Sequence, residues 1–287
     1  MESRFLLLDG KKIKTGSPLI EVDNRTFRYG DGCFETIKVI AGQIPLFSFH
    51  IERLLFTLEQ LDMALPPHLT AHRLEEQIIE LASSNQHVSN ARIRLSFFRG
   101  SGGLYDADIP YPHWLIQSWQ GPELTGQLHS NGIDLGIYPD ARKSCDRFSN
   151  LKSAQFLSYA MAARWAKKNH FNDAVVLNGE GRIADTTISN LFALIEGSWC
   201  TPSLSEGPIN GVMRRYLLSA MQQRGIPVKE RPITPEELAH AQEIMLTNAI
   251  SGIRWVKSLG DFGYTCSSAT ELFHQLIVPL WQKSRRP

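Results

Sequence analysis

The stretch Arg182-Ile-Ala-Asp-Thr-Thr-Ile-Ser-Asn-Leu-Phe192 carries the most information about the fold of this 287-residue chain. Its acidic residue Asp185 is followed five positions later by Asn190 and then by an apolar residue and an aromatic one. Further along, Asn210-Gly-Val-Met-Arg214 begins a predicted amphipathic helix with glycine. Backbone N–H groups at such a helix start favour a bound dianion. This helix start is therefore a candidate site for a phosphate group.

Upstream, Lys152 lies in Ser149-Asn-Leu-Lys-Ser-Ala-Gln-Phe-Leu157, at the predicted start of an Ala-rich helix. A Lys amine becomes nucleophilic when its ammonium is desolvated or lies beside another cation, because both lower its pKa. Together with the downstream stretch, this pattern resembles the class IV aminotransferase family. In that family a Lys forms a Schiff base with pyridoxal phosphate (PLP). The resemblance implies an α/β (mixed α+β) chain with the two-domain fold of fold type IV PLP enzymes, similar to D-amino acid aminotransferase.

The resemblance also assigns roles to the other motifs. His50-Ile-Glu-Arg-Leu54 resembles the family's His-x-x-Arg-Leu, whose Arg is the phosphate cation. Gly211-Val-Met213 resembles the helix start that holds the phosphate, and Thr247-Asn-Ala249 resembles the last phosphate loop. The residues implied for cofactor binding are Arg53, Lys152, Asp185, Asn190, Val212, Met213, Asn248 and Ala249, and Lys152 is the implied catalytic residue.

The acid at position 185 departs from the family pattern, in which it is usually Glu. PLP works as an electron sink only if its ring nitrogen stays protonated, and a facing carboxylate secures this. Asp185 is one methylene shorter, which would leave its carboxylate about 1.5 Å short of the ring nitrogen. We therefore expect a backbone shift or a bridging water there. A non-catalytic, ligand-binding relative of the family is an alternative that this departure supports.

Two glycine-rich motifs favour one branch of the family. Tyr29-Gly-Asp-Gly-Cys-Phe34 and Arg99-Gly-Ser-Gly-Gly103 resemble segments of the 4-amino-4-deoxychorismate lyases. Leu157 stands where branched-chain aminotransferases have a Tyr, and the Arg-x-His carboxylate trap of the D-amino acid enzymes does not follow Arg99. The resemblance implies a lyase that makes 4-aminobenzoate and pyruvate for folate synthesis, with Tyr29 and Arg99 near the substrate's carboxylates. A branched-chain or D-amino acid aminotransferase is the alternative, and Arg99 is equally well explained as the anchor of a hairpin.

Composition limits the partners of the chain. Thirty basic residues nearly balance 29 acidic ones, without a run of one sign, so a small-molecule amino substrate is expected and no nucleic acid. The four cysteines lie far apart without metal-binding spacing, which predicts no metal site. No apolar run approaches the ~18 residues of a membrane span or the pattern of a signal peptide, which predicts a cytoplasmic protein without a membrane partner. The family resemblance implies a homodimer.

The predicted organisation has two domains. A smaller N-terminal α/β domain spans residues 1–119, a linker with two glycines and a proline spans 120–126, and a larger domain with most of the PLP site spans 127–287. Hydrophobic periodicity and turn residues predict strands over 33–40, 92–98, 113–119, 132–138, 174–177 and within 183–195. Capping residues predict helices that begin at Ser48, Thr70, Ser153, Gly211, Thr234 and Ser268.

Overall fold

The computed structural model describes residues 3–106 and 111–283, which form two compact units. Unit 1 contains the described residues up to Leu124, the segment Leu151–Gln155 and the C-terminal residues from Leu280. Unit 2 contains Thr125–Asn150 and Phe156–Pro279. The segment Leu151–Gln155 thus belongs to unit 1, although its neighbours on both sides belong to unit 2. The predicted domain bounds 1–119 and 127–287, with a linker at 120–126, stay a prediction.

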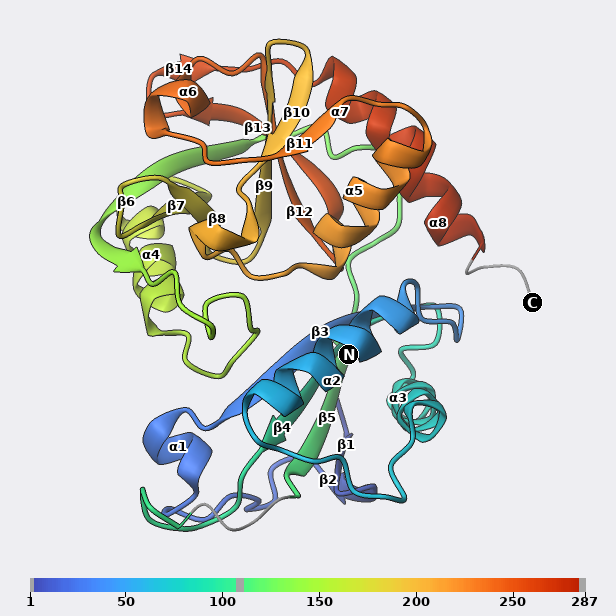
Figure 1. Cartoon of the computed structure of the whole chain (residues 1–287). Helices are drawn as coiled ribbons and strands as arrows, with labels where there is room; N and C mark the ends of the chain where they lie inside the picture. Colours follow the sequence, from blue (N-terminus) through green and yellow to red (C-terminus); the bar gives the residue numbers. More distant parts are fainter. Residues whose placement is uncertain (1–2, 107–110, 284–287) are drawn as a thin grey trace. The chain divides into compact units, whose positions relative to one another are not determined.

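Unit 1 is built on a five-stranded antiparallel sheet with the order β2-β1-β5-β4-β3 (Figure 1). Its strands are β1 (Phe5–Leu8), β2 (Lys11–Lys14), β3 (Gly32–Ile40), β4 (Asn90–Phe98) and β5 (His113–Gln120). Its helices are α1 (Arg25–Tyr29), α2 (Phe47–Gln60) and α3 (Ala71–Ser84). The apolar stripes of α2 and α3 pack on one face of the sheet and form a continuous hydrophobic core with it.

The strand β3 alternates as its sequence predicts. Cys33 and Ile37 contribute to the core under the helices, and Glu35 faces the same helices. Phe34 and Lys38 therefore lie on the opposite face of the sheet, because successive side chains in a strand point to opposite sides. The predicted strands at 92–98 and 113–119 are confirmed as β4 and β5, each with one or two more residues.

Unit 2 is built on a nine-stranded mixed sheet with the order β11-β10-β9-β12-β13-β6-β7-β8, and β14 pairs with β13. Its strands are β6 (Ile133–Lys143), β7 (Asp173–Asn178), β8 (Ile183–Thr186), β9 (Asn190–Ile195), β10 (Ser198–Thr201), β11 (Val228–Glu230), β12 (Glu243–Asn248), β13 (Gly252–Leu259) and β14 (Phe262–Gly263). Its helices are α4 (Leu157–Lys168), the 3-10 turn η1 (Leu204–Glu206), α5 (Val212–Gln223), α6 (Pro235–Ala239) and α7 (Ser267–Leu272), followed by a π-helical turn η2 (Phe273–Ile277) and α8 (Val278–Lys283), which continues past the border of the unit.

Three predicted helix starts are confirmed. Thr70 caps α3, because its hydroxyl accepts the Arg73 N–H. Thr234 forms a capping box with Glu237, with proline at the first helical position of α6. Gly211 is the N-cap of α5, and the helix ends before Gly225, which has the positive φ that glycine adopts without strain.

At three other places the predicted helix exists, but its start or its cap differs from the prediction. The helix α2 begins at Phe47, after Leu46 in a left-handed conformation, so Ser48 is not its cap. The helix α4 begins only at Leu157, because the predicted first turn from Ser153 pairs with β3 instead. The N-terminal N–H groups of α7 are satisfied by the carboxylate of Glu243 from β12, not by a side chain of the helix. At α4 and α7 a tertiary contact overrides the local signal.

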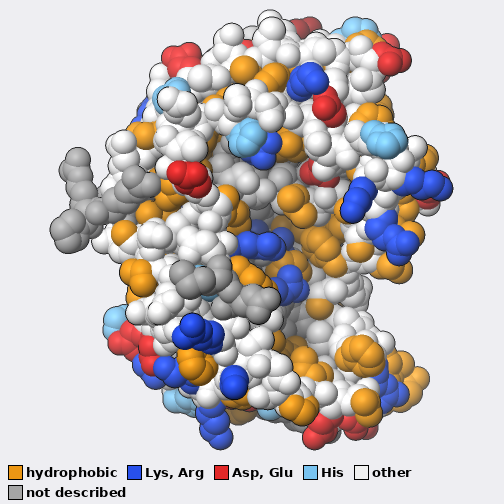
Figure 2. All heavy atoms as spheres, turned by 180° about the vertical axis from the view of Figure 1, so that it is seen from behind, with side chains coloured by type: hydrophobic (Ala, Val, Ile, Leu, Met, Phe, Trp, Pro, Cys, Tyr) orange, Lys and Arg blue, Asp and Glu red, His pale blue; other side chains and the backbone are white. Residues whose placement is uncertain are grey.

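On the face drawn in Figure 2, basic and acidic side chains are interspersed with hydrophobic ones. Among the helices of residues 3–106 and 111–283, none combines the length and the apolar character that crossing a bilayer requires.

Candidate active site

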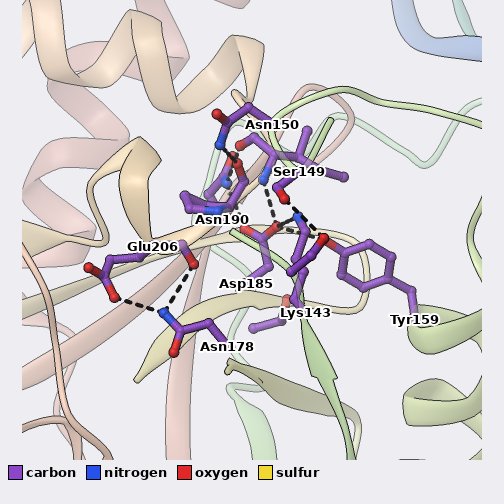
Figure 3. A network of polar contacts seen from close by, with 12 residues as sticks. Lys143, Ser149, Asn150, Tyr159, Asn178, Asp185, Asn190 and Glu206 are labelled. Atoms are coloured by element: carbon purple, nitrogen blue, oxygen red, sulfur yellow. Dashed lines mark hydrogen bonds and ion pairs between the residues drawn. The ribbon is translucent and has the colours of Figure 1, made fainter. Parts of the chain in front are cut away.

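The carboxylate of Asp185, on β8, is the centre of a buried polar network in unit 2 (Figure 3). The residue is 2% exposed. Its Oδ2 accepts hydrogen bonds from the Tyr159 hydroxyl at 2.9 Å and the Ile209 N–H at 2.8 Å, and lies 3.2 Å from the Nζ of Lys143. Its Oδ1 accepts from the Asn190 Nδ2 at 2.8 Å. Four donors therefore hold one carboxylate in a single orientation.

Lys143 and Tyr159 were not among the predicted site residues. Lys143 ends β6, which continues beyond the predicted strand 132–138, and Tyr159 lies in the first turn of α4. Burial lowers the pKa of Lys143, although Asp185 acts in the opposite direction. Burial and the neighbouring Asp185 raise the pKa of Tyr159 well above its ordinary value, so its hydroxyl keeps its proton and donates it to the hydrogen bond.

The helix start predicted to bind phosphate lies directly beside this network. The side chain of Asn190 joins them, since its Nδ2 also donates to the Ile209 carbonyl at 2.8 Å, two residues before Gly211. A Cβ atom added at Gly211 would overlap the Oδ1 of Asn190, so only glycine fits there. Val212 and Met213 are the first two residues of α5, where backbone N–H groups have no acceptor within the helix.

The strand β12 brings the last predicted loop to the same place, because Thr247 pairs with Asn190 across the sheet. Asn248 donates to the Ser189 hydroxyl at 3.0 Å, and its Oδ1 accepts the N–H groups of Ile250 and Ser251, which fixes the turn that contains Ala249. The Oγ1 of Thr247 is buried and has no hydrogen-bond partner among the described residues. Since buried hydroxyls are normally satisfied, this atom indicates that a polar ligand completes the site.

Replacing Gly211 by alanine is expected to weaken PLP binding and to lower the free energy of unfolding by about 1–3 kcal/mol. The new methyl group must displace Asn190, which also holds Asp185. Gly179→Ala is the matched control, because a Cβ there meets no atom within 4 Å. Cofactor titration and urea unfolding measure both effects. Equal results for the two variants would show that close contact at Gly211 is unimportant.

In unit 1, Lys152 is held by the edge of β3 and not by a helix cap. Its carbonyl accepts the Phe34 N–H at 3.0 Å, and the Ala154 N–H donates to the Gly32 carbonyl at 2.8 Å. The Nζ of Lys152 lies 4.6 Å from the centroid of the Phe34 ring. The Lys152 side chain thus extends along the face of the sheet opposite to α2 and α3.

On the helix side of β3, Glu35 forms a buried charge cluster with two residues of α2. Arg53 donates to both of its carboxylate oxygens, at 2.7 and 2.6 Å, and His50 Nδ1 lies 2.7 Å from Oε2. Burial alone would raise the pKa of Glu35, but Arg53 and His50 outweigh it and lower the pKa to about 2. Burial lowers the pKa of His50, which favours its neutral form with the proton on Nδ1. The role of Arg53 as a phosphate cation stays a prediction.

The two glycine-rich motifs of unit 1 are tied together by Asp31. Its carboxylate lies 3.2 Å from the Nε of Arg99 and 2.9 Å from the Nε of Arg25. Arg99 also donates to the carbonyls of Leu61 and Asp62, where α2 ends. Arg99 is thus an anchor between loops, and its role toward a substrate carboxylate stays a prediction.

Tyr29, the other predicted substrate residue, ends α1 in the same region of unit 1. The guanidinium groups of Arg25 and Arg28 lie 5.6 and 5.0 Å from the centroid of its ring. These cation–π contacts hold the ring beside the loop that Arg99 anchors. Contact of Tyr29 with a substrate stays a prediction.

The face of the unit 1 sheet opposite to α2 and α3 carries positive charge, and the ammonium of Lys38 is buried on it, 3.9 Å from the centroid of the Trp281 ring. We call Lys38, Arg92, Arg94 and Lys152 the basic face. The positions of β3, β4 and β5 that point to this side contain no Asp or Glu, since Glu35 points to the other side. Arg94 stacks 3.7 Å from the centroid of the Phe34 ring that Lys152 also approaches. Burial and the neighbouring Arg92 lower the pKa of Arg94. An anionic group bound here would meet several cations.

Comparisons with known proteins agree on one protein family, which includes lyases and aminotransferases. The profile described as "Amino-transferase class IV" matches residues 32–259. The aminodeoxychorismate lyase of Vibrio harveyi is 27% identical over 243 residues, which cover 84% of this chain and 87% of the relative. A putative branched-chain-amino-acid aminotransferase of Methanocaldococcus jannaschii is 26% identical over 251 residues, covering 86% and 85%. The crystal structure of the branched-chain aminotransferase of Thermoproteus uzoniensis superposes with a TM-score of 0.87 at 22% identity, covering 98% of this chain and 96% of the other, which shows the shared fold.

Proposed function

The chain belongs to the amino-transferase class IV family of PLP-dependent enzymes, and from this premise we propose that it is an aminodeoxychorismate lyase. Such an enzyme converts 4-amino-4-deoxychorismate to 4-aminobenzoate and pyruvate. Assembly as a homodimer and a cytoplasmic location, in folate synthesis, stay predictions from the sequence.

The residues of unit 2 fit the cofactor. Val212 and Met213 offer backbone donors at a helix start, and the buried Thr247 hydroxyl lacks a partner among the residues that the structure describes. Both features suit a phosphate dianion. Asp185 would face the ring nitrogen, and Asn248 and Ala249 would complete the phosphate site. In unit 1, Lys152 would form the covalent link to the cofactor.

One observation carries the choice of the lyase branch: the two motifs that resemble the lyases form a single structure. Asp31, from Tyr29-Gly-Asp-Gly-Cys-Phe34, binds Arg99, which begins Arg99-Gly-Ser-Gly-Gly103. Arg25 extends the connection, since it binds Asp31 and the Gly103 carbonyl. The two segments that resemble the lyases therefore belong to one connected structure. This supports the proposal that the chain uses the same substrate as the lyases.

The basic face supports a substrate with more than one carboxylate. The substrate of the proposed reaction carries a ring carboxylate and an enolpyruvyl carboxylate. Arg92 and Arg94 lie two positions apart on the same face of β4, and Arg94 stacks on the Phe34 ring that Lys152 approaches. Cations in a partly buried setting bind carboxylates strongly and select for charge. We propose Arg94 as a carboxylate-binding residue in addition to the predicted Tyr29 and Arg99.

In the proposed reaction, two residues have the main chemical roles: Lys152 and Asp185. When bound, PLP supplies an electron sink for the bond that breaks at the substrate. Lys152 would take the proton from the amine-bearing ring carbon and deliver a proton to the departing pyruvate enol. Asp185 would hold the proton on the cofactor's ring nitrogen. An aminotransferase of this family would differ in where the proton returns, and the similarity to the Methanocaldococcus protein favours that second candidate.

The test is to incubate the PLP-loaded protein with 4-amino-4-deoxychorismate and, separately, with D-alanine or L-leucine plus 2-oxoglutarate. Equal amounts of 4-aminobenzoate and pyruvate without glutamate are expected. Glutamate without 4-aminobenzoate would establish an aminotransferase instead. If the protein binds no PLP at all, the lyase and the aminotransferase proposals are both contradicted. A non-catalytic relative of the family would then be favoured.

A further inference from the structure

The two carboxylate oxygens of Asp185 have different numbers of contacts with the protein. Within residues 3–106 and 111–283, Oδ2 is contacted by Lys143, Tyr159 and the Ile209 N–H, whereas Oδ1 accepts a hydrogen bond from Asn190 alone. Each oxygen of an ionised carboxylate can accept at least two hydrogen bonds. Oδ1 therefore keeps one acceptor site, and the three donors on Oδ2 fix where this site points. Figure 3 shows Lys143 and Tyr159 reaching Asp185 from different elements.

Lys143 is the counter-charge of this carboxylate. A buried carboxylate without a compensating cation takes up a proton, because desolvation penalises its charged form. The side chain of Lys143 is 9% exposed and that of Asp185 is 3% exposed, so water screens the pair weakly. Tyr159 faces both partners: its hydroxyl donates to Asp185, and its ring centroid lies 5.2 Å from the Nζ of Lys143. Cys145 and Asp146 also act electrostatically on Lys143.

We propose that Lys143 and Tyr159 are positioning residues that act on the cofactor through Asp185, by keeping its carboxylate charged and aimed so that the ring-nitrogen proton stays on the nitrogen. The inference rests on the proposed role of Asp185. A proton shared by a carboxylate and a pyridine nitrogen can reside on either. A cation next to the carboxylate lowers the energy of the arrangement with a charged carboxylate and a pyridinium. The contacts of Lys143 and Tyr159 would thus compensate for the shorter side chain of Asp185, because they control the charge and the orientation of its carboxylate.

The test is the nitrogen NMR resonance of PLP that is isotopically labelled at the ring nitrogen and bound to the whole protein at one fixed pH near neutrality. In the unaltered protein a pyridinium resonance is expected. Lys143→Met removes the charge and keeps the length of the side chain, and it is expected to move the resonance toward that of neutral pyridine. Tyr159→Phe is expected to move it in the same direction by less. Lys143→Arg is expected to preserve the pyridinium.

Lys168→Met is the matched control, because this Lys is exposed at the end of α4. Asp185→Asn separates the possible failures. If Asp185→Asn abolishes the pyridinium resonance while Lys143→Met and Tyr159→Phe leave it unchanged, the inference is overturned and the role of Asp185 stands. If Asp185→Asn also leaves it unchanged, the proposed role of Asp185 itself is wrong. The product assay decides the reaction independently of either result. If Lys143→Met does not fold, the resonance measured with Tyr159→Phe tests the inference in its place.

Discussion

Replacing Lys152 by alanine is expected to lower kcat/KM at least about a thousand-fold, because one residue supplies both the covalent link and the proton transfers. PLP should still bind through the phosphate contacts of unit 2, but without the visible absorbance band of its link to a Lys. Steady-state kinetics and the absorbance spectrum of the purified variant measure the two effects.

Lys168→Ala is the control for this change, since its side chain is exposed and α4 tolerates alanine. A Lys152→Ala protein that kept the absorbance band would contradict the assignment. Lys143 would then be the first residue to test, because its Nζ lies 3.2 Å from the carboxylate of Asp185 and burial lowers its pKa.

The second large effect is on stability. Glu35→Gln is expected to lower the free energy of unfolding by about 3–5 kcal/mol, because it removes the negative charge from a buried ion pair. Arg53 is 7% exposed, and both of its contacts to Glu35 are under 3 Å. Urea unfolding of the two proteins measures the difference.

Glu76→Gln is the matched control, because its pair with Arg73 is about half exposed on α3 and contributes at most about 1 kcal/mol. The pH dependence adds a second check. The folded-state pKa of Glu35 is about 2, below its ordinary 4.5, so its stabilisation is present above that ordinary value and is lost as pH falls toward 2. The difference between Glu35→Gln and the unaltered protein should shrink over that range. A difference no larger than that of Glu76→Gln would rule out the cluster as a source of stability.

Much of the fold follows from local patterns. The strand β3 is predicted by simple alternation, and α3 and α6 are predicted by their capping residues, since these signals act within a few positions. The start of α4 is not predictable in this way. The residues after Lys152 favour a helix locally, but the backbone of Ser153 pairs with Cys33, more than a hundred positions earlier.

The polar network around Asp185 is harder to predict for the same reason. Asp185, Asn190 and Gly211 follow a spacing that the family resemblance identifies. Lys143 has no such signal: it reaches Asp185 because β6 and β7 pair in parallel, with an irregular register before Arg142. The unpartnered Thr247 hydroxyl also becomes visible only when burial and hydrogen bonds are known.

The pairing of residues 152–154 with β3 has a consequence for solubility. In the sheet of unit 1, β3 is an edge strand, and exposed edges invite pairing with other chains. The segment that carries Lys152 covers part of this edge through the hydrogen bonds to Gly32 and Phe34. A chain that ended before Leu151 would leave these backbone groups bare. The same few residues thus serve two requirements: they place the reactive amine, and they protect the strand against aggregation.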